Sequence, residues 1–485
     1  MKISDKELDA LIQSEEKHSF NKTFEFRGEK EKTAVKAPVR RFTVVAVAAL
    51  LAVCMIAAAV FVALKINNGI TPIERPDKPE VEPFAGVKGN YSGAKYMCLA
   101  DTTLTAKSVF EAVGYYNYYS EYRQSAEKLY GFFDKLTAKL LDGSESGVVS
   151  PVNIYMALAL LAECTETTSR QQILDVLGVS DMEELREQAK LIWLYNSKDD
   201  EYGRSLLANS IWLSSSLPVK EQCVNYLKDD HFASTFTGNF DDVNYVNALK
   251  QWLSDQTNGL LDDCINELEI ECDTKAVLAS TLYYKARWNA EYNDTESGVF
   301  KGIYGKENCT FNKKTVKDTY IYKGDGFTAY AEQLSDGNMM WFFLPDKNKS
   351  VSDVINSGIV SYINGKTDGK AYDVTVRMPD FDVEYNESIK GKLIQLGITE
   401  CLDEEKADFS ALSDDQLYLA SAVHAARFKA DKEGVEGAAY TVMAIAGNGM
   451  PQIKLKYNFT LDRPFVFAVV NNTVPLFVGC VNDLG

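Results

Sequence analysis

Near its C-terminal end the chain reads Glu433-Gly434-Val435-Glu436-Gly437-Ala438-Ala439-Tyr440-Thr441, then Val442-Met443-Ala444-Ile445-Ala446-Gly447-Asn448-Gly449-Met450-Pro451. No charged residue occurs between Glu436 and Lys454. The Gly/Asn/Pro end has turn chemistry and suits an exposed loop. In an extended chain every second residue from position 435 to 443 shares one face, which a sheet could bury without desolvating a charge. The stretch therefore suits both an exposed loop and a buried strand.

Taken alone, this stretch would also fit an ordinary edge strand followed by a hairpin. The surrounding sequence favours another interpretation, because His424 lies ten residues before Gly434 and further landmarks occur in a fixed order. These are Ser150-Pro151-x-x-Ile154, residues 252–260, Leu282-Tyr283-Tyr284-Lys285-Ala286-Arg287-Trp288, Met378-Pro379-Asp380-Phe381, Leu396-Gly397-Ile398, Asp408-Phe409-Ser410, residues 462–467 and residues 476–482. Together they resemble the serpin family of protease inhibitors.

The resemblance implies an α+β serpin fold with a large central mixed β-sheet, two smaller sheets, about nine helices and an exposed reactive loop. Hydrophobic periodicity independently predicts a long helix at 125–141 and a buried helix around 154–161. We expect helical segments to continue to about residue 265. Strands are predicted at 276–284, 339–344, 372–378, 417–430 and 466–470. Helices first and strands later are typical of an α+β protein.

The resemblance also implies that the chain is an inhibitor and not an enzyme. In that mechanism a serine or cysteine protease cleaves the loop and stays covalently bound, while the freed loop enters the central sheet. Residues 433–441 form the hinge, and the family spacing implies a reactive bond at Asn448–Gly449, with Ala446–Gly447 as the alternative. Gly437 stands where the family commonly has alanine, and Tyr440 replaces another small residue, so the resemblance implies a competent hinge with slower insertion. The alternative function is a non-inhibitory serpin that serves as a binding or scaffold protein.

Four residues match the serpin shutter, in the middle of the sheet: Ser150, Asn153, Ser280 and His424. Trp288 matches the breach, where insertion begins. The family usually has serine at 153 and asparagine at 280, so we hypothesise that the amide and the hydroxyl have exchanged places. A hydrolase that uses Ser150 and His424 is a third interpretation. The sequence disfavours it, because there is no Gly-x-Ser-x-Gly motif and Pro151 lacks the N–H of an oxyanion hole.

Composition limits the remaining possibilities. The 485 residues have a globular composition and a formal net charge of −18, which disfavours binding to nucleic acid. With three histidines and no Cys-x-x-Cys pair, we expect no metal site and no cofactor. Outside the cell a disulfide is permitted, but the positions of the nine cysteines do not identify a pairing, so buried free thiols are the default expectation. We expect a monomer.

Residues 42–64 carry no charge and no proline. As a helix they would span roughly 35 Å, enough for a bilayer core of about 30 Å. Arg40 and Arg41 precede this run, which predicts a single-pass anchor with a cytoplasmic N-terminus. The expected organisation is a cytoplasmic tail (1–41), a transmembrane signal anchor (42–64), an extracellular stem (65–105) and an extracellular serpin domain (106–485). A cleaved signal peptide is the alternative, and the match of Cys54 to a lipoprotein box is poor.

Overall fold

The structure is a computed structural model that describes residues 95–98, 119–365, 369–435 and 455–484. All of these residues belong to one compact unit, Glu82–Gly485. They form ten α-helices and one short 3-10 helix, Glu400–Leu402, so the fold is α+β. The α-helices are α4 (Tyr119–Leu140), α5 (Pro151–Cys164), α6 (Thr167–Leu177), α7 (Met182–Asn196), α8 (Glu221–Asp229), α9 (Val243–Gln256), α10 (Asp262–Glu267), α11 (Val351–Ile355), α12 (Ile359–Gly365) and α13 (Lys390–Leu396).

One sheet has eight strands in the order β1-β5-β4-β6-β14-β13-β12, with β3 paired to β4 beside this path. The β4–β5 pair is parallel whereas β4–β6 is antiparallel, so the sheet is mixed. Its strands are β1 (Lys95–Cys98), β3 (Lys198–Asp199), β4 (Gly203–Ser214), β5 (Ala233–Gly238), β6 (Ala276–Arg287), β12 (Phe381–Ser388), β13 (Val423–Ala430) and β14 (Gly434–Val435).

The second sheet has nine strands, where the sequence led us to expect two smaller sheets. They are joined because β8 is 18 residues long: its first eight residues pair with β7, residues 311–322 pair with β11, and its last three residues pair with β9. Its strands are β2 (Gly147–Val149), β7 (Asp294–Lys301), β8 (Lys306–Lys323), β9 (Phe327–Gln333), β10 (Met339–Pro345), β11 (Gly369–Pro379), β15 (Lys456–Thr460), β16 (Phe465–Asn471) and β17 (Val474–Val481).

The expectation of helices throughout the chain up to residue 265 was wrong, since β4 and β5 lie within that region. Nine of the twelve residues of β4 are buried, and its last eight residues are buried without interruption, so both faces of that part of the strand are covered. A strand that is covered on both sides is continuously apolar and resembles a buried helix in sequence. The predicted strands at 276–284, 339–344, 372–378 and 466–470 are confirmed as parts of β6, β10, β11 and β16.

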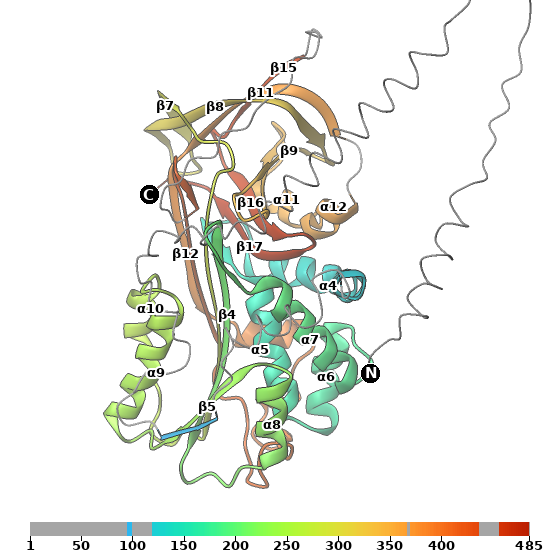
Figure 1. The fold of residues 1–485 in the computed structure, drawn as a ribbon, viewed down its shortest axis with the longest axis vertical. Coiled ribbons are helices and arrows are strands. Elements are labelled where there is room, and N and C mark those ends of the chain that lie inside the picture. Colours follow the sequence, from blue (N-terminus) through green and yellow to red (C-terminus); the bar gives the residue numbers. More distant parts are fainter. Residues whose placement is uncertain (1–94, 99–118, 366–368, 436–454, 485) are drawn as a thin grey trace, which may run out of the picture. The chain divides into compact units, whose positions relative to one another are not determined.

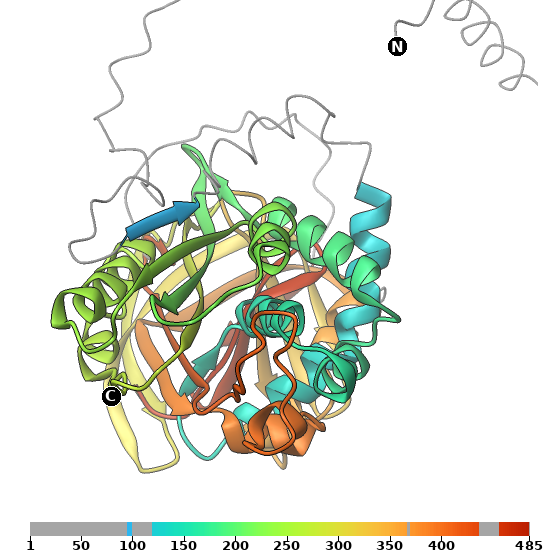
Figure 2. The ribbon, with the colours of Figure 1, turned by 90° about the horizontal axis from the view of Figure 1, so that it is seen from below.

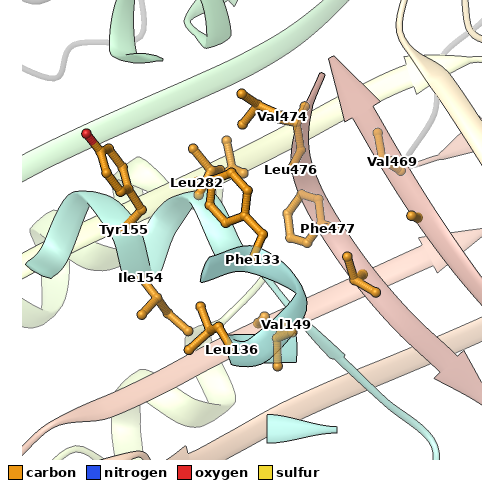
Figure 3. Packing of buried hydrophobic residues seen from close by; sticks show 14 of the residues in the cluster. Phe133, Leu136, Val149, Ile154, Tyr155, Leu282, Val469, Val474, Leu476 and Phe477 are labelled. Atoms are coloured by element: carbon orange, nitrogen blue, oxygen red, sulfur yellow. The ribbon is translucent and has the colours of Figure 1, made fainter. Parts of the chain in front are cut away.

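Helices cover both faces of the eight-stranded sheet: α9 and α10 lie on one side of β4, and α5 to α8 lie on the other (Figure 1). In Figure 2, α5 is seen nearly end-on in the middle of the molecule. All but one of its fourteen residues are buried, as the apolar sequence predicted. Side chains of α4, α5, β6 and β17 meet in the core, among them Phe133, Tyr155, Leu282 and Phe477 (Figure 3). The core thus joins α5 to both sheets.

The N-terminal predictions fall mostly outside the described residues, including the 42–64 segment. Within the described part of the chain, no helix is long and apolar enough to cross a membrane. β1 lies inside the segment 65–105 that we assigned to a stem, and it pairs with β5. The eight-stranded sheet therefore begins before residue 106.

Candidate functional site

The eight-stranded sheet contains a two-residue strand between two long ones. In β14, Gly434 is opposite Arg287 of β6, and Val435 lies between Ala286 of β6 and Ala430 of β13. Among the described residues, β6 and β13 are joined only through β14. A small cavity adjoins Val435 and is lined by Leu260, Leu282, Tyr284, Arg427, Phe428, Lys429 and Phe477. We call the position between β6 and β13 that would continue β14 the insertion gap.

Gly434 stands where the hinge backbone passes closest to β6. A Cβ atom at this position would lie 2.4 Å from the carbonyl oxygen of Ala286 and 2.7 Å from Cα of Arg287. Only glycine allows this approach without a shift of the backbone. The next residue, Val435, is 1% exposed, so the hinge begins with an apolar side chain that is already buried.

A tight turn connects β13 to the hinge, and Asp431 organises it. Its carboxylate accepts hydrogen bonds from the backbone N–H groups of Glu433 (2.7 Å) and Gly434 (3.1 Å), and its own N–H donates to the carbonyl of Gly434. The indole N–H of Trp288 donates to the carbonyl of Asp431 at 2.7 Å. Trp288, predicted to mark the entry point, is thus in direct contact with the turn that precedes the hinge.

Beneath Trp288 lies a buried ion pair that the sequence analysis missed. Lys314 of β8 pairs with Glu332 of β9, and each side chain is 5% exposed. The ammonium group of Lys314 lies 3.8 Å from the ring centroid of Tyr292 and 5.3 Å from that of Trp288. Tyr292 also donates to the carboxylate of Glu332 at 3.2 Å. Burial acts to lower the pKa of Lys314, and the contact with Glu332 offsets this by favouring the charged form. This cluster supports the indole ring that holds the hinge turn.

The four predicted shutter residues meet at the N-terminus of α5. The backbone N–H of Ser150, the N-cap residue, donates to Nε2 of His424 on β13 at 3.1 Å. The side-chain amide of Asn153 donates to the hydroxyl of Ser280 on β6 at 3.1 Å. Each of the two strands beside the insertion gap is therefore tied to the same helix end by one hydrogen bond. The amide and the hydroxyl that we hypothesise to have exchanged places are hydrogen-bonded to each other directly.

His424 is placed as a structural group and not as a catalytic base. Its Nε2 accepts the backbone N–H of Ser150, whereas the Ser150 hydroxyl accepts the N–H of Asn153 as a helix cap. A neutral ring that accepts at Nε2 carries its proton on Nδ1. Burial lowers the pKa of His424 to about 4, which keeps the ring neutral at pH 7. The imidazole does not activate the hydroxyl, as a hydrolase of the third interpretation would need.

Part of the predicted site lies outside the described residues: hinge positions 436–441, the reactive bond Asn448–Gly449 and its alternative Ala446–Gly447. The structure describes both ends of this connection. On the N-terminal side, Val435 lies in the eight-stranded sheet. On the C-terminal side, Lys456 begins β15, which pairs with β11 in the nine-stranded sheet. In the described ranges, no three His, Cys, Asp or Glu side chains are grouped so that they could hold a metal ion.

Comparison with known proteins identifies the same family as the sequence landmarks. Residues 130–484 match the family described as "Serpin (serine protease inhibitor)". Serpin-ZX of Arabidopsis thaliana is 25% identical over 358 residues, which cover 69% of this chain and 91% of that protein. The native structure of tengpin, a thermophilic serpin, is 24% identical with a TM-score of 0.66, covering 74% of this chain and 94% of tengpin. Thyroxine-binding globulin in complex with thyroxine is 19% identical with a TM-score of 0.63, covering 76% of this chain and all of that one.

The contact between Asn153 and Ser280 predicts that substitutions at these two positions change the free energy of unfolding in a non-additive way. Asn153→Ser or Ser280→Asn alone removes one partner and should lower the free energy of unfolding by about 1–2 kcal/mol. The double variant restores an amide and a hydroxyl in reversed positions, so its loss should be smaller than the sum of the two. Denaturant unfolding of the three variants measures this, and strictly additive losses would contradict the hypothesis of exchanged partners.

The buried position of His424 predicts a specific dependence of stability on pH. Its pKa is about 4 when folded and 6.5 in the unfolded reference, so between these values the unfolded state binds the extra proton. The full stability contribution is present above pH 6.5 and is lost as the pH falls towards 4, by about 3 kcal/mol in total.

The variant His424→Gln keeps a hydrogen-bond acceptor but cannot titrate. Its denaturation midpoint should therefore fall less steeply between pH 6.5 and 4 than that of the wild type, whatever its stability at pH 7. Parallel curves for the two proteins would show that His424 does not titrate with a lowered pKa.

Proposed function

Because this chain belongs to the serpin family, whose members are protease inhibitors rather than enzymes, we propose that it traps a serine or cysteine protease as a suicide substrate. The protease cleaves the segment after Val435 and forms an acyl-enzyme. The freed loop then enters the insertion gap between β6 and β13 and drags the bound protease with it. The observation that carries this proposal is β14, whose two residues pair in register with β6 and β13 at the start of that gap.

The register of β14 predicts where each loop residue would lie after insertion. Gly434 opposes Arg287, and Val435 opposes Ala286 and Ala430. Continuing both antiparallel pairings residue by residue brings Ala439 opposite Leu282 and Ala426, and Thr441 opposite Ser280 and His424. The inserted strand would thus have a small hydroxyl residue at the shutter and alanine beside the core.

The period of the strand decides which loop residues become buried. Val435 points inward and is 1% exposed. Since side chains alternate, Gly437, Ala439 and Thr441 would point inward as well, while Glu436 and Tyr440 would face outward. The inward residues carry no charge, so burial has no large desolvation cost. Glycine at 437 leaves a small void, which supports slower insertion but not its prevention.

Insertion would lower the free energy of the sheet. About ten new ladder hydrogen bonds at roughly 1 kcal/mol each would contribute on the order of 10 kcal/mol, and apolar burial adds to this. The uncut segment cannot fill the gap in the same way, because it must return to β15 in the other sheet. The proposed inhibitor is therefore metastable until the reactive bond is cut, at Asn448–Gly449 or at Ala446–Gly447.

The position of the protein in the cell is part of the same proposal. Residues 42–64 would anchor it in the membrane, with residues 1–41 in the cytoplasm and the serpin domain outside as a monomer. The length of the uncharged run and the preceding Arg40 and Arg41 support this arrangement. Outside the cell the inhibitor would meet secreted or surface proteases.

The test mixes the purified full-length chain with serine and cysteine proteases of different specificity. A covalent complex that survives boiling in detergent supports trapping, and the mass of the released C-terminal fragment identifies the reactive bond. Cleavage by every reactive protease without any such complex would contradict the proposal and support a non-inhibitory serpin. Thyroxine-binding globulin shows that a similar fold can bind a small molecule.

Substitutions in the loop test the insertion step by itself. Val435→Arg and Thr441→Arg put a charge on the inward face, where an unpaired charge costs several kcal/mol. Each should raise the number of inhibitor molecules cleaved per protease trapped by about tenfold or more, since 1.4 kcal/mol changes a rate tenfold.

Tyr440→Arg is the matched control, because it places the same charge on the neighbouring, outward-facing residue. It should trap the protease as efficiently as the wild type. Equal trapping by all three variants would show that the loop does not insert with the register of β14.

A further inference from the structure

Two buried cysteines face each other where α5 meets α8. Cys164 is the last residue of α5 and is 1% exposed, and Cys223 lies in the first turn of α8 and is 3% exposed. An interaction with the Cys223 thiol, together with burial, holds the pKa of Cys164 well above its ordinary value. Cys223 Sγ is also 3.5 Å from the carbonyl oxygen of Glu163, the residue before Cys164.

The other buried cysteines have different surroundings. The thiol of Cys480 donates to the backbone carbonyl of Glu145 at 3.2 Å. Cys401 lies in the 3-10 helix Glu400–Leu402, with its backbone carbonyl accepting from Leu419. Cys264 and Cys272, the pair that are near each other in sequence, are partly or fully exposed. The seven cysteines whose side chains the structure describes are free thiols.

A network of charged groups holds the two helix ends in place around this thiol pair. Arg186 of α7 donates two hydrogen bonds to the carboxylate of Glu163, at 2.6 and 2.9 Å, and its guanidinium lies 3.5 Å from the ring centroid of Tyr226 on α8. The ring of His231 contacts the same carboxylate at 3.2 Å. Although burial acts in the opposite direction, hydrogen bonds from Arg186 and His231 lower the pKa of Glu163 to about 2. The fold thus fixes α5 and α8 with the two thiols adjacent.

We propose that Cys164 and Cys223 form a disulfide that joins the end of α5 to the start of α8. The oxidant is a low-molecular-weight disulfide such as oxidised glutathione. One cysteine thiolate attacks it, giving a mixed disulfide and one released thiol. The second thiolate then attacks the protein sulfur of the mixed disulfide and releases the other thiol. The two cysteines lose two protons and two electrons in total, and the oxidant is reduced to two thiols.

The timing of this reaction follows from burial. In the folded chain both thiols are covered and the raised pKa of Cys164 leaves little thiolate, so exchange is slow. Oxidation therefore takes place while the chain folds, before α5 and α8 close over the pair. Once formed, the bond closes a long loop of the unfolded chain between residues 164 and 223, which favours the folded state. An extracellular location, as proposed above, would supply the oxidising conditions.

The experiment folds the full-length chain in two glutathione buffers, one oxidising and one reducing. Free thiols are then alkylated under denaturing conditions, and peptides are analysed by mass spectrometry. The oxidised sample should yield one bridged peptide that joins Cys164 to Cys223. A cooperatively melting protein from the oxidising buffer in which both cysteines are alkylated, or either is joined to another cysteine, would overturn the proposal.

Single-residue variants add a second measurement. Cys164→Ala and Cys223→Ala should each lower the apparent melting temperature by about 5 °C more in the oxidising than in the reducing buffer. Cys401→Ala, which removes a buried thiol without a neighbouring one among its described contacts, should cause the same loss in both. Equal losses in both buffers for all three variants would also overturn the proposal. Neither measurement depends on protease trapping, so failure here and failure of the proposed function are separate results.

Discussion

The N-terminus of α5 holds the two strands that the loop would have to separate. Its cap residue Ser150 binds His424 of β13, and Asn153, one turn further, binds Ser280 of β6. Both contacts are weak singly, at about 1 kcal/mol each in a buried site. Placed side by side at one rigid helix end, they set the distance between β6 and β13. Any strand that enters the gap has to pass this point.

A different set of groups organises the end of the insertion gap where β14 lies. Trp288 binds the carbonyl of Asp431, and the carboxylate of Asp431 binds the N–H groups that lead into β14. The buried pair of Lys314 and Glu332 packs beneath the indole ring. The described start of the hinge, Gly434 and Val435, thus lies in register with both neighbouring strands. Two hydrogen-bonded centres, one at the entry and one in the middle of the gap, would control the same movement.

The sequence predicted the parts of this site that depend on local chemistry. The uncharged stretch after Glu436 is visible without any structure, and so are the landmarks around Ser150 and His424. The buried ion pair of Lys314 and Glu332 was not predictable in this way. Lys313 and Lys314 are adjacent, yet alternation along β8 leaves the first partly exposed and buries the second. Whether a lysine is buried depends on which strand covers it, and β9 supplies Glu332 only after the sheet has formed.

The same distinction applies to the whole chain. By itself, the sequence determined the family and the helices with clear periodicity, and it predicted the hinge and shutter residues, because each depends on short segments. The tertiary structure alone decided that β4 is a strand, that β8 joins two sheets into one, that Asn153 meets Ser280, and that Cys164 lies against Cys223. These contacts join residues from 59 to 127 positions apart or depend on burial from both faces, and only the packing of the sheets and helices brings such groups together.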